Sequence, residues 1–343
     1  MENEKIKVLG LLSGGLDSHI ATKLMVKLGY DVTVMNFMSP FCNCTKKSDG
    51  CKSAAHKIAS ESDVEIKTAF MGEEYLEIIR NPKHGYGSGI NPCLDCRIMM
   101  FSQAKKAMED IGAKFIFTGE VLSQRPMSQM KNRMEKIEKE TGLQGLIVRP
   151  LSAGVMEPTT PEKEGWINRD DMLAISGKSR KEQITVGREL GIPEENLCSS
   201  GGCLLTDPHF SVKMRDLISH TDKTDVKEAR RLQVGRHFRL DDGAKVIVGR
   251  DMSENLKLEN LVREDDTVIK ILNFMGPYVV LSGKPSNGAA VSTVMTAARI
   301  AARYATAPEG AEVEIECTDL STKSHELLKV LPLSDDVLEK LRV

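Results

Sequence analysis

The first half of the chain alternates between two patterns of apolar residues. Short, nearly continuous apolar runs are typical of parallel strands buried on both faces, and they lie at residues 6–12, 31–38, 64–70 and 114–120. The intervening and following segments predict helices at residues 19–28, 73–80, 127–141 and 179–190. This alternation predicts an α/β fold with a doubly wound parallel sheet, whose ligands bind at the carboxyl ends of the strands.

The pattern changes near residue 225. Short strands are predicted at residues 238–240, 244–249, 267–272, 278–281 and 312–317, and an alanine-rich helix at residues 289–304. Asp242-Gly243 is a good hairpin signal between the first two of these strands. We therefore divide the chain into an α/β domain at residues 1–224 and a smaller α+β domain at residues 225–343.

The composition is that of a globular protein, because 41% of the 343 residues are hydrophobic and 28% are charged. No apolar run approaches the ~18 residues of a membrane span, and the amino terminus lacks a signal-peptide pattern, so we expect a cytoplasmic protein without a membrane partner. A net charge of −2 excludes a uniformly basic nucleic-acid binder but permits local basic patches. Eight cysteines in a cytosolic chain are more typical of metal or catalytic sites than of disulfides.

The turn Ser13-Gly14-Gly15-Leu16-Asp17-Ser18 joins the first predicted strand to the first predicted helix. Its paired glycines let the backbone approach a ligand, and the N–H groups of the turn converge where the helix dipole also favours an anion. Thr118 and Gly119 follow another predicted strand and should reach the same edge of the sheet. The simpler alternative is a glycine-rich turn in which Asp17 or Ser18 caps the helix.

This turn resembles the Ser-Gly-Gly-x-Asp-Ser loop of the ATP pyrophosphatase (PP-loop) family, which has a HUP-like fold. The resemblance implies that ATP is cleaved between its α and β phosphates, so that an acceptor oxygen is adenylated and pyrophosphate leaves. The residues that it implies in binding ATP and Mg²⁺ are Ser13, Gly14, Gly15, Asp17 and Ser18, with Thr118 and Gly119 beside the nucleotide.

Cys93 and Cys96 are separated by two residues where a loop enters a predicted helix, and Cys203 lies in a second glycine-rich turn. Two thiols at this spacing can hold one metal, and a helix start lowers the pKa of a thiol, which favours the thiolate. A lone pair of this kind is also typical of redox sites and zinc half-sites. A further group of thiols has three open interpretations: a second metal site with a nearby histidine, a sulfur relay, or a surface loop. Its members are Cys42, Cys44 and Cys51, with His56.

Two cysteine motifs resemble those of the tRNA 2-thiouridine synthases, in the same order. They are Asn91-Pro92-Cys93-Leu94-Asp95-Cys96 and Ser200-Gly201-Gly202-Cys203. The resemblance implies that Cys93, Cys96 and Cys203 hold a [4Fe–4S] cluster and leave one iron open for an extra sulfide. The alternatives are a persulfide on one cysteine that another cysteine resolves, and structural zinc or inert thiols.

The carboxyl-terminal domain begins with a local excess of positive charge. Seven Lys and Arg residues stand against three acidic residues between positions 227 and 250, which predicts a phosphate-binding face or, more simply, a solvated charged face. Residues 243–251 with Asn255 resemble the RNA-binding domain of the NFACT proteins, which implies that this domain binds tRNA. The RNA contacts that we predict are Arg236, Arg239, Lys245, Arg250 and Asn255.

Together these features predict an ATP-dependent tRNA sulfurtransferase that adenylates a base carbonyl oxygen and replaces it with sulfur. The predicted catalytic residues are Asp17, Cys96 and Cys203. The predicted partners are tRNA and a sulfur donor, which is sulfide or a persulfide-carrying protein, and a homodimer is compatible with the sequence. Two other functions stay open. One is a PP-loop sulfur transferase or amidating enzyme for a small cofactor precursor, and the other is a tRNA-binding quality-control factor with a regulatory nucleotide site.

Overall fold

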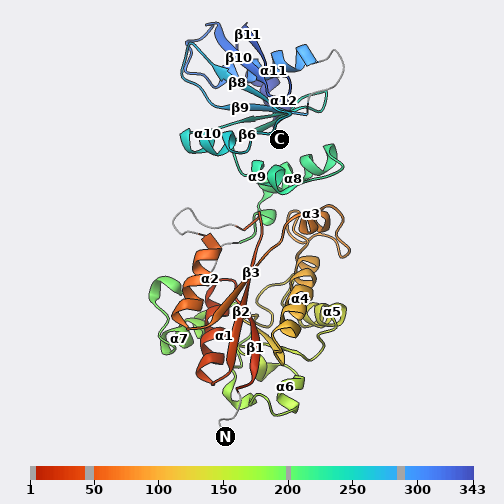
Figure 1. The fold of residues 1–343 in the computed structure, drawn as a ribbon, viewed down its shortest axis with the longest axis vertical. Coiled ribbons are helices and arrows are strands. Elements are labelled where there is room, and N and C mark those ends of the chain that lie inside the picture. The colour runs from red at the N-terminus through yellow and green to blue at the C-terminus, as the bar shows by residue number, and fades with distance from the viewer. Residues whose placement is uncertain (1–4, 43–49, 198–201, 284–289) are drawn as a thin grey trace. The chain divides into compact units, whose positions relative to one another are not determined.

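The computed structural model describes residues 5–42, 50–197, 202–283 and 290–343. The chain divides into two compact units, Met1–Asp207 and Pro208–Val343 (Figure 1). This division falls upstream of the predicted boundary between residues 224 and 225, because helix α8 (Pro208–His220) belongs to the second unit. Cys44 and the Ser200-Gly201 part of the second cysteine motif lie outside the described residues.

Five parallel strands form the sheet of the first unit, in the order β3-β2-β1-β4-β5. Their bounds are β1 (Lys7–Leu11), β2 (Asp31–Met38), β3 (Glu65–Phe70), β4 (Phe115–Thr118) and β5 (Ile147–Val148). The predicted parallel sheet is confirmed. Because β2 and β4 flank β1, the loops that follow β1 and β4 diverge at the switch point where such sheets bind ligands.

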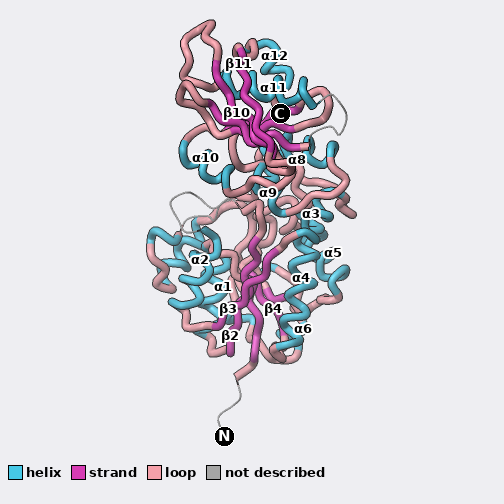
Figure 2. The backbone as a smooth tube through the Cα atoms, turned by 45° about the horizontal axis from the view of Figure 1, so that its top comes forward, coloured by secondary structure: helices cyan, strands magenta, loops and turns pink. Residues whose placement is uncertain are grey.

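Helices cover both faces of this sheet (Figures 1 and 2). Their bounds are α1 (Leu16–Lys27), α2 (Gly50–Glu61), α3 (Glu73–Arg80), α4 (Cys93–Asp110), α5 (Lys131–Thr141), α6 (Thr160–Lys163) and α7 (Lys181–Glu189). Alternate residues of β1 enter different cores, since Val8 packs in a cluster with α1 and α2, whereas Leu9 and Leu11 pack in a cluster with α4 and α5. No helix in the described ranges combines the length and the apolar character needed to cross a membrane.

A separate six-stranded antiparallel sheet forms the second unit, in the order β11-β10-β8-β9-β7-β6. Its strands are β6 (Arg236–Arg239), β7 (Lys245–Val248), β8 (Thr267–Ile271), β9 (Val279–Ser282), β10 (Val313–Asp319) and β11 (Ser324–Val330). Its helices are α8, α9 (Val226–Arg231), α10 (Met252–Glu259), α11 (Ala290–Arg303) and α12 (Asp335–Leu341). The predicted α+β architecture is confirmed, and the alanine-rich α11 packs Ala297, Ala298 and Ala301 into the core.

Three elements of the second unit were not predicted from the sequence: β11, α10 and α12. Strand β11 lies at the edge of the sheet and exposes most of its side chains, so its sequence lacks the buried alternating face by which strands are recognised. Helix α10 begins after Asp251, whose carboxylate accepts a hydrogen bond from the Glu254 N–H at 2.9 Å. This capping acid was a helix signal, but the segment was assigned only to the RNA-binding resemblance.

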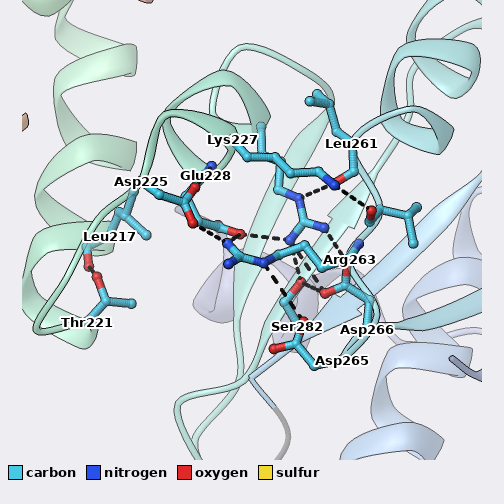
Figure 3. Close-up of polar contacts among 12 residues, drawn as sticks. Leu217, Thr221, Asp225, Lys227, Glu228, Leu261, Arg263, Asp265, Asp266 and Ser282 are labelled. Carbon is cyan, nitrogen blue, oxygen red and sulfur yellow. Dashed lines mark hydrogen bonds and ion pairs between the residues drawn. The ribbon is translucent and has the colours of Figure 1, made fainter. Parts of the chain in front are cut away.

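A buried arginine joins α9 to the sheet of the second unit. The Arg231 side chain is 0% exposed, and its guanidinium pairs with the buried Asp266 and with Glu228, the latter at 2.8 Å. It also donates to the Ser282 hydroxyl at 3.1 Å, and that hydroxyl donates to Asp266 at 2.6 Å. Figure 3 shows Glu228, Arg263 and Asp266 of this network close together. Every charge in the network therefore has a partner of opposite sign.

Removal of the Asp266 carboxylate is expected to destabilise the second unit by about 3 kcal/mol, because the fully buried Arg231 loses its buried partner and keeps only Glu228, which it shares with Arg263. Urea unfolding of the full-length Asp266→Ala variant measures the loss, and hydrogen exchange locates it at α9 and β8. Asp265→Ala is the matched control, since this neighbouring carboxylate is 79% exposed and its removal costs about 0.5 kcal/mol or less. Equal stability of the two variants would show that the buried pair contributes nothing.

Candidate active site

The turn at residues 13–18 has the geometry of a strand-to-helix anion site. Gly14 has φ +81°, in the left-handed region that glycine adopts freely. The Ser13 N–H donates to the Ser18 hydroxyl at 3.3 Å, and that hydroxyl donates to the Gly15 carbonyl at 2.9 Å. Gly15 is the N-cap of α1, so neither Asp17 nor Ser18 caps the helix, contrary to the simpler alternative.

A pocket opens at the carboxyl ends of β1, β2 and β4, the edge predicted from the strand pattern. It unites the turn after β1, the residues after β4, three arginines and three thiols. The predicted site residues among its lining are Ser13, Gly15, Asp17, Ser18, Thr118, Gly119, Cys96 and Cys203. The nucleotide and cysteine motifs, which are far apart in the sequence, therefore belong to one pocket.

Arg97, Arg125 and Arg180 bring three guanidinium groups to this pocket from α4, the loop after β4 and the residue before α7. Burial raises the pKa of Asp17, while the Arg180 and Arg125 guanidinium groups act in the opposite direction. The Asp17 Oδ1 atom is buried and has no hydrogen-bond partner within the described residues. A buried carboxylate oxygen without a partner is the kind of ligand that Mg²⁺ prefers, so the residues present fit this ion.

Glu120 is the second carboxylate of the pocket lining and is only 3% exposed. Its Oε2 atom accepts from Arg149 Nε at 3.1 Å, and Arg149 in turn donates to Glu138 at 2.7 Å. Arg97 lies 3.8 Å from the other oxygen of Glu120. Arg149, which lies outside the lining, neutralises the charge of Glu120. The net charge of the remaining lining residues is therefore positive, which suits a polyanion such as a triphosphate.

Gly119 permits a close approach of two backbone segments. A Cβ atom at this position would lie 2.4 Å from the Asp17 carbonyl carbon and 2.4 Å from the Ser18 nitrogen. The contact is therefore with backbone atoms of the anion-binding turn, which no side-chain rotation relieves. The segment after β4 thus holds the turn after β1 in place.

Gly119→Ala is expected to lower the affinity for ATP by at least about ten-fold, equivalent to about 1.4 kcal/mol, because the added methyl displaces the turn. Isothermal titration calorimetry with ATP and Mg²⁺ measures the effect. Gly202→Ala is the matched control, since a Cβ atom there meets nothing within 4 Å although the residue lines the same pocket. Unchanged affinity in Gly119→Ala would show that the turn adapts without loss.

The structure brings the predicted cysteines together and adds one. Cys93 and Cys96 lie in the first turn of α4, so Cys93 is already helical where the sequence suggested a loop. Cys96 and Cys203 line the pocket, and Cys42 joins them through an antiparallel bridge to Cys203. Tyr75 of α3 hydrogen-bonds to Cys96.

Burial raises the pKa of Cys96 to about 11 and that of Cys203 to about 12. The expectation that the start of the helix lowers the pKa is therefore wrong for Cys96, because the loss of solvent around the thiolate outweighs the hydrogen bond from Tyr75 and the charge of Arg97. Tyr75 is 2% exposed and packs edge-on against Phe41, with the ring centroids 6.0 Å apart. Both thiols hold their protons near neutral pH in this environment.

No group of three or more His, Cys, Asp and Glu side chains is arranged to hold a metal ion among the residues that the structure describes. This gives no support to a zinc ion on Cys93, Cys96 and Cys203. The donor chemistry fits iron, because cysteine thiolates are the usual ligands of [4Fe–4S] clusters, and a cluster spaces its ligand sulfurs more widely than a single ion does. The cluster predicted from the sequence stays a prediction.

Several pocket residues were not assigned to the site from the sequence, among them Tyr75, Arg97 and Arg180. Tyr75 belongs to the buried stripe of α3 and is indistinguishable in sequence from an ordinary core residue. Arg180 precedes α7 in a cluster of basic residues that is typical of a solvated helix start. Their one sequence signal is a position near the start of a helix, which is too common to identify a site.

Two of the predicted RNA contacts hold α8 on the sheet of the second unit. Arg239 pairs with Asp216 of α8 at 2.7 Å, and Lys245 pairs with the same carboxylate at 2.8 Å. Burial lowers the pKa of Lys245, and the Asp216 carboxylate opposes this shift. These two cations thus have an evident structural role, and their contact with RNA stays a prediction.

The other three predicted RNA contacts differ in accessibility. Arg250 is 51% exposed and pairs with Glu254 on the surface of α10. The Arg236 guanidinium lies 4.7 Å from the centre of the Tyr304 ring. The remaining residue, Asn255, accepts a hydrogen bond from the Tyr278 N–H at 3.1 Å and therefore positions β9. Arg250 offers the most exposed of these donors, and its RNA contact also stays a prediction.

The fold and the pocket define an α/β nucleotide-binding unit of the PP-loop class. Residues 4–155 match the family model of the thiamine biosynthesis protein (ThiI), and residues 235–342 match that of the NFACT protein RNA binding domain. These matches confirm the PP-loop and NFACT resemblances noted in the sequence, each over less than half of the chain.

Several known proteins are similar to parts of the chain. A probable tRNA sulfurtransferase of Methanosarcina acetivorans is 33% identical over 120 residues, which cover 33% of this chain and 27% of that protein. A probable tRNA sulfurtransferase of Methanothermobacter thermautotrophicus is 33% identical over 226 residues, covering 65% of this chain and 50% of that protein. A crystal structure of a 4-thiouridine synthetase–RNA complex with bound ATP has 21% identity and a TM-score of 0.38, covering 62% of this chain and 50% of that chain. The chain thus spans at most half the length of these relatives.

Proposed function

We propose that the protein is an ATP-dependent tRNA sulfurtransferase. The observation that carries the proposal is the union of two chemistries in one pocket, where the anion-binding turn and three arginines lie with the thiols of Cys96 and Cys203. The family-model match and the two relatives named as probable tRNA sulfurtransferases support the same reaction class.

The first step activates a base carbonyl of the bound RNA. The carbonyl oxygen attacks the α-phosphorus of ATP, a new P–O bond forms, and pyrophosphate leaves. Backbone N–H groups of the turn at residues 13–18 and the guanidinium groups of Arg125 and Arg180 stabilise the charge that moves onto the leaving pyrophosphate. Mg²⁺ held by Asp17 would add to this stabilisation.

The second step replaces oxygen by sulfur. The sulfur adds to the activated carbon, and AMP departs with the original carbonyl oxygen. Cys96 and Cys203 border the pocket and are the thiols that present this sulfur. As ligands of a cluster they would hold it at the oxidation level of sulfide. As a persulfide carrier, one of them attacks the carbon through its terminal sulfur, and the other cleaves the S–S bond by forming a protein disulfide, which an external thiol then reduces. A [4Fe–4S] cluster on Cys93, Cys96 and Cys203, when bound, would supply a hydrosulfide.

The proposal is tested with full-length protein purified without oxygen. The protein is incubated with ATP, Mg²⁺, sulfide and unmodified tRNA, and the digested RNA is analysed for a thionucleoside by mass spectrometry. We expect a sulfur-bearing base that appears only with ATP and is accompanied by pyrophosphate. Pyrophosphate release with a small molecule, and no thionucleoside, would indicate that the substrate is a cofactor precursor and not RNA. ATP binding without pyrophosphate release would indicate a regulatory nucleotide site.

Arg250→Ala is expected to weaken tRNA binding about three- to ten-fold and to lower the salt dependence of binding by about one ion, because an exposed guanidinium suits a phosphate contact. Filter binding over a range of salt concentrations measures both quantities. Arg303→Ala is the matched control, as Arg303 is also exposed and paired with an acid, Asp335, at 2.7 Å but is not a predicted contact. Equal affinity in both variants contradicts an RNA contact at Arg250.

A further inference from the structure

Cys42 faces Cys203 across a short antiparallel backbone pairing. The two residues form an isolated bridge, and the Leu204 N–H donates to the Phe41 carbonyl at 2.9 Å. This hydrogen bond joins the neighbouring residues, Phe41 and Leu204, and not the two cysteines. Cys42 and Cys203 are therefore the non-hydrogen-bonded pair of the ladder, in which the side chains of the two strands approach most closely.

That arrangement matches the spacing of a disulfide. A non-hydrogen-bonded antiparallel pair places its Cα atoms about 4.5 Å apart, and disulfides span Cα distances of about 4.4–6.8 Å. Neither cysteine belongs to a disulfide in the described part of the chain, and both are partly exposed at the same pocket. Formation of the bond thus requires rotation of side chains and little movement of the backbone.

The position of the Cys42 sulfur is fixed by its own loop. The Ser39 N–H lies 3.4 Å from Cys42 Sγ, and the Ser39 hydroxyl lies 3.5 Å from the same atom. Cys96, the other thiol of the pocket, lies in the first turn of α4 and hydrogen-bonds to Tyr75. Of the described cysteines, Cys42 is the one that the backbone pairs with Cys203.

We propose that Cys42 and Cys203 form a reversible disulfide, which withdraws the Cys203 sulfur from the pocket. The oxidant is a low-molecular-weight disulfide. The Cys42 thiolate attacks one sulfur of this oxidant and releases one thiol as a mixed disulfide forms. Cys203 Sγ then attacks Cys42 Sγ and passes its proton to the second thiol as that thiol leaves, so that two protein thiols are oxidised and one small disulfide is reduced.

The consequence for sulfur transfer rests on the proposed function. Oxidised protein keeps the turn at residues 13–18, Asp17 and the arginines, none of which takes part in the exchange. It lacks a Cys203 sulfur that can bind a cluster or carry a persulfide. Oxidation of the pair therefore stops sulfur transfer but leaves ATP binding intact, and the ratio of small thiols to small disulfides in solution sets how much of the protein is oxidised.

Peptide mapping tests the bond directly. Reduced full-length protein is incubated without oxygen in mixtures of reduced and oxidised glutathione, quenched with iodoacetamide, digested and sequenced by tandem mass spectrometry. We expect a peptide linked through Cys42 and Cys203 that dithiothreitol releases. Cys42→Ser should abolish this peptide, whereas the matched variant Cys93→Ser should retain it, which separates loss of the partner from a general effect of removing a thiol near the site. Linkage of Cys203 to any other cysteine, or a Cys203 that stays reduced in excess oxidised glutathione, overturns the proposal.

A second readout follows thionucleoside formation before and after oxidation. We expect oxidation to lower it at least about ten-fold, with recovery after dithiothreitol and with ATP binding unchanged. A linked protein that transfers sulfur at the full rate contradicts the withdrawal of Cys203 while leaving the sulfurtransferase function intact. If the reduced protein makes no thionucleoside at all, the proposed function fails, and the mapped linkage alone decides the disulfide.

Discussion

Replacement of Asp17 by asparagine is expected to lower pyrophosphate release about 10³-fold with little loss of folding. The amide keeps the size of the side chain but removes the charge of the lining carboxylate whose buried Oδ1 atom has no hydrogen-bond partner among the described residues. Without that charge the site would lose the carboxylate that fits Mg²⁺, and Glu120 would be the one carboxylate left among the three guanidinium groups of the described lining. Release of pyrophosphate is measured with a coupled assay at saturating ATP and tRNA.

Asp31→Asn is the matched control for this result. Asp31 is the exposed first residue of β2, and the pocket lies at the carboxyl ends of the strands. The same chemical change is therefore made at the opposite end of the strand from the pocket. The control is expected to retain full activity. If the Asp17→Asn variant cleaves ATP as fast as the control, Asp17 has no role in the reaction.

Cys203→Ala is expected to abolish thionucleoside formation, by at least about 10³-fold, while ATP-dependent pyrophosphate release persists. The separation follows from the pocket, since Cys203 belongs to its thiol lining and the phosphate-binding turn makes no use of it. Mass spectrometry of digested tRNA and the pyrophosphate assay are run on the same samples. Loss of both activities would instead indicate that Cys203 maintains the nucleotide site.

Cys317→Ala provides the thiol control. Cys317 is 3% exposed in the core of the second unit, so its removal shortens a side chain without touching the pocket. Thionucleoside formation in this variant should match wild type, apart from a stability cost of about 1 kcal/mol. A comparable loss of transfer in both variants would refute a specific role for Cys203.

Local sequence patterns were sufficient for most of the fold because they report burial. The observed β2 (Asp31–Met38) and α3 (Glu73–Arg80) coincide with their predicted ranges, since an apolar run or an apolar stripe is visible within a few residues. Strand β11 was missed for the opposite reason. At the edge of a sheet a strand is held by backbone hydrogen bonds to one neighbour, which leave little trace in its side chains.

The sequence by itself determined the anion-binding turn, because a strand, two glycines, an acid and a hydroxyl specify it within six consecutive positions. It also determined that Cys93 and Cys96 share one end of a helix. Which distant groups join them was decided by the tertiary structure alone. The parallel pairing of β1 with β4 brings Gly119 against Asp17, and the pairing of two loops sets Cys42 opposite Cys203.

The pKa values of the thiols and the availability of the basic residues were likewise decided by the tertiary structure. Desolvation depends on everything that packs around a group, so no local pattern foretells that burial raises the pKa of Cys96 where a helix start alone would lower it. In the same way, a lysine or arginine in the sequence is only a charge. Asp216, contributed by α8, engages Arg239 and Lys245 in the folded unit, while Arg250 remains at the surface. A chain pattern specifies which chemical groups exist, and packing specifies their neighbours and their solvent.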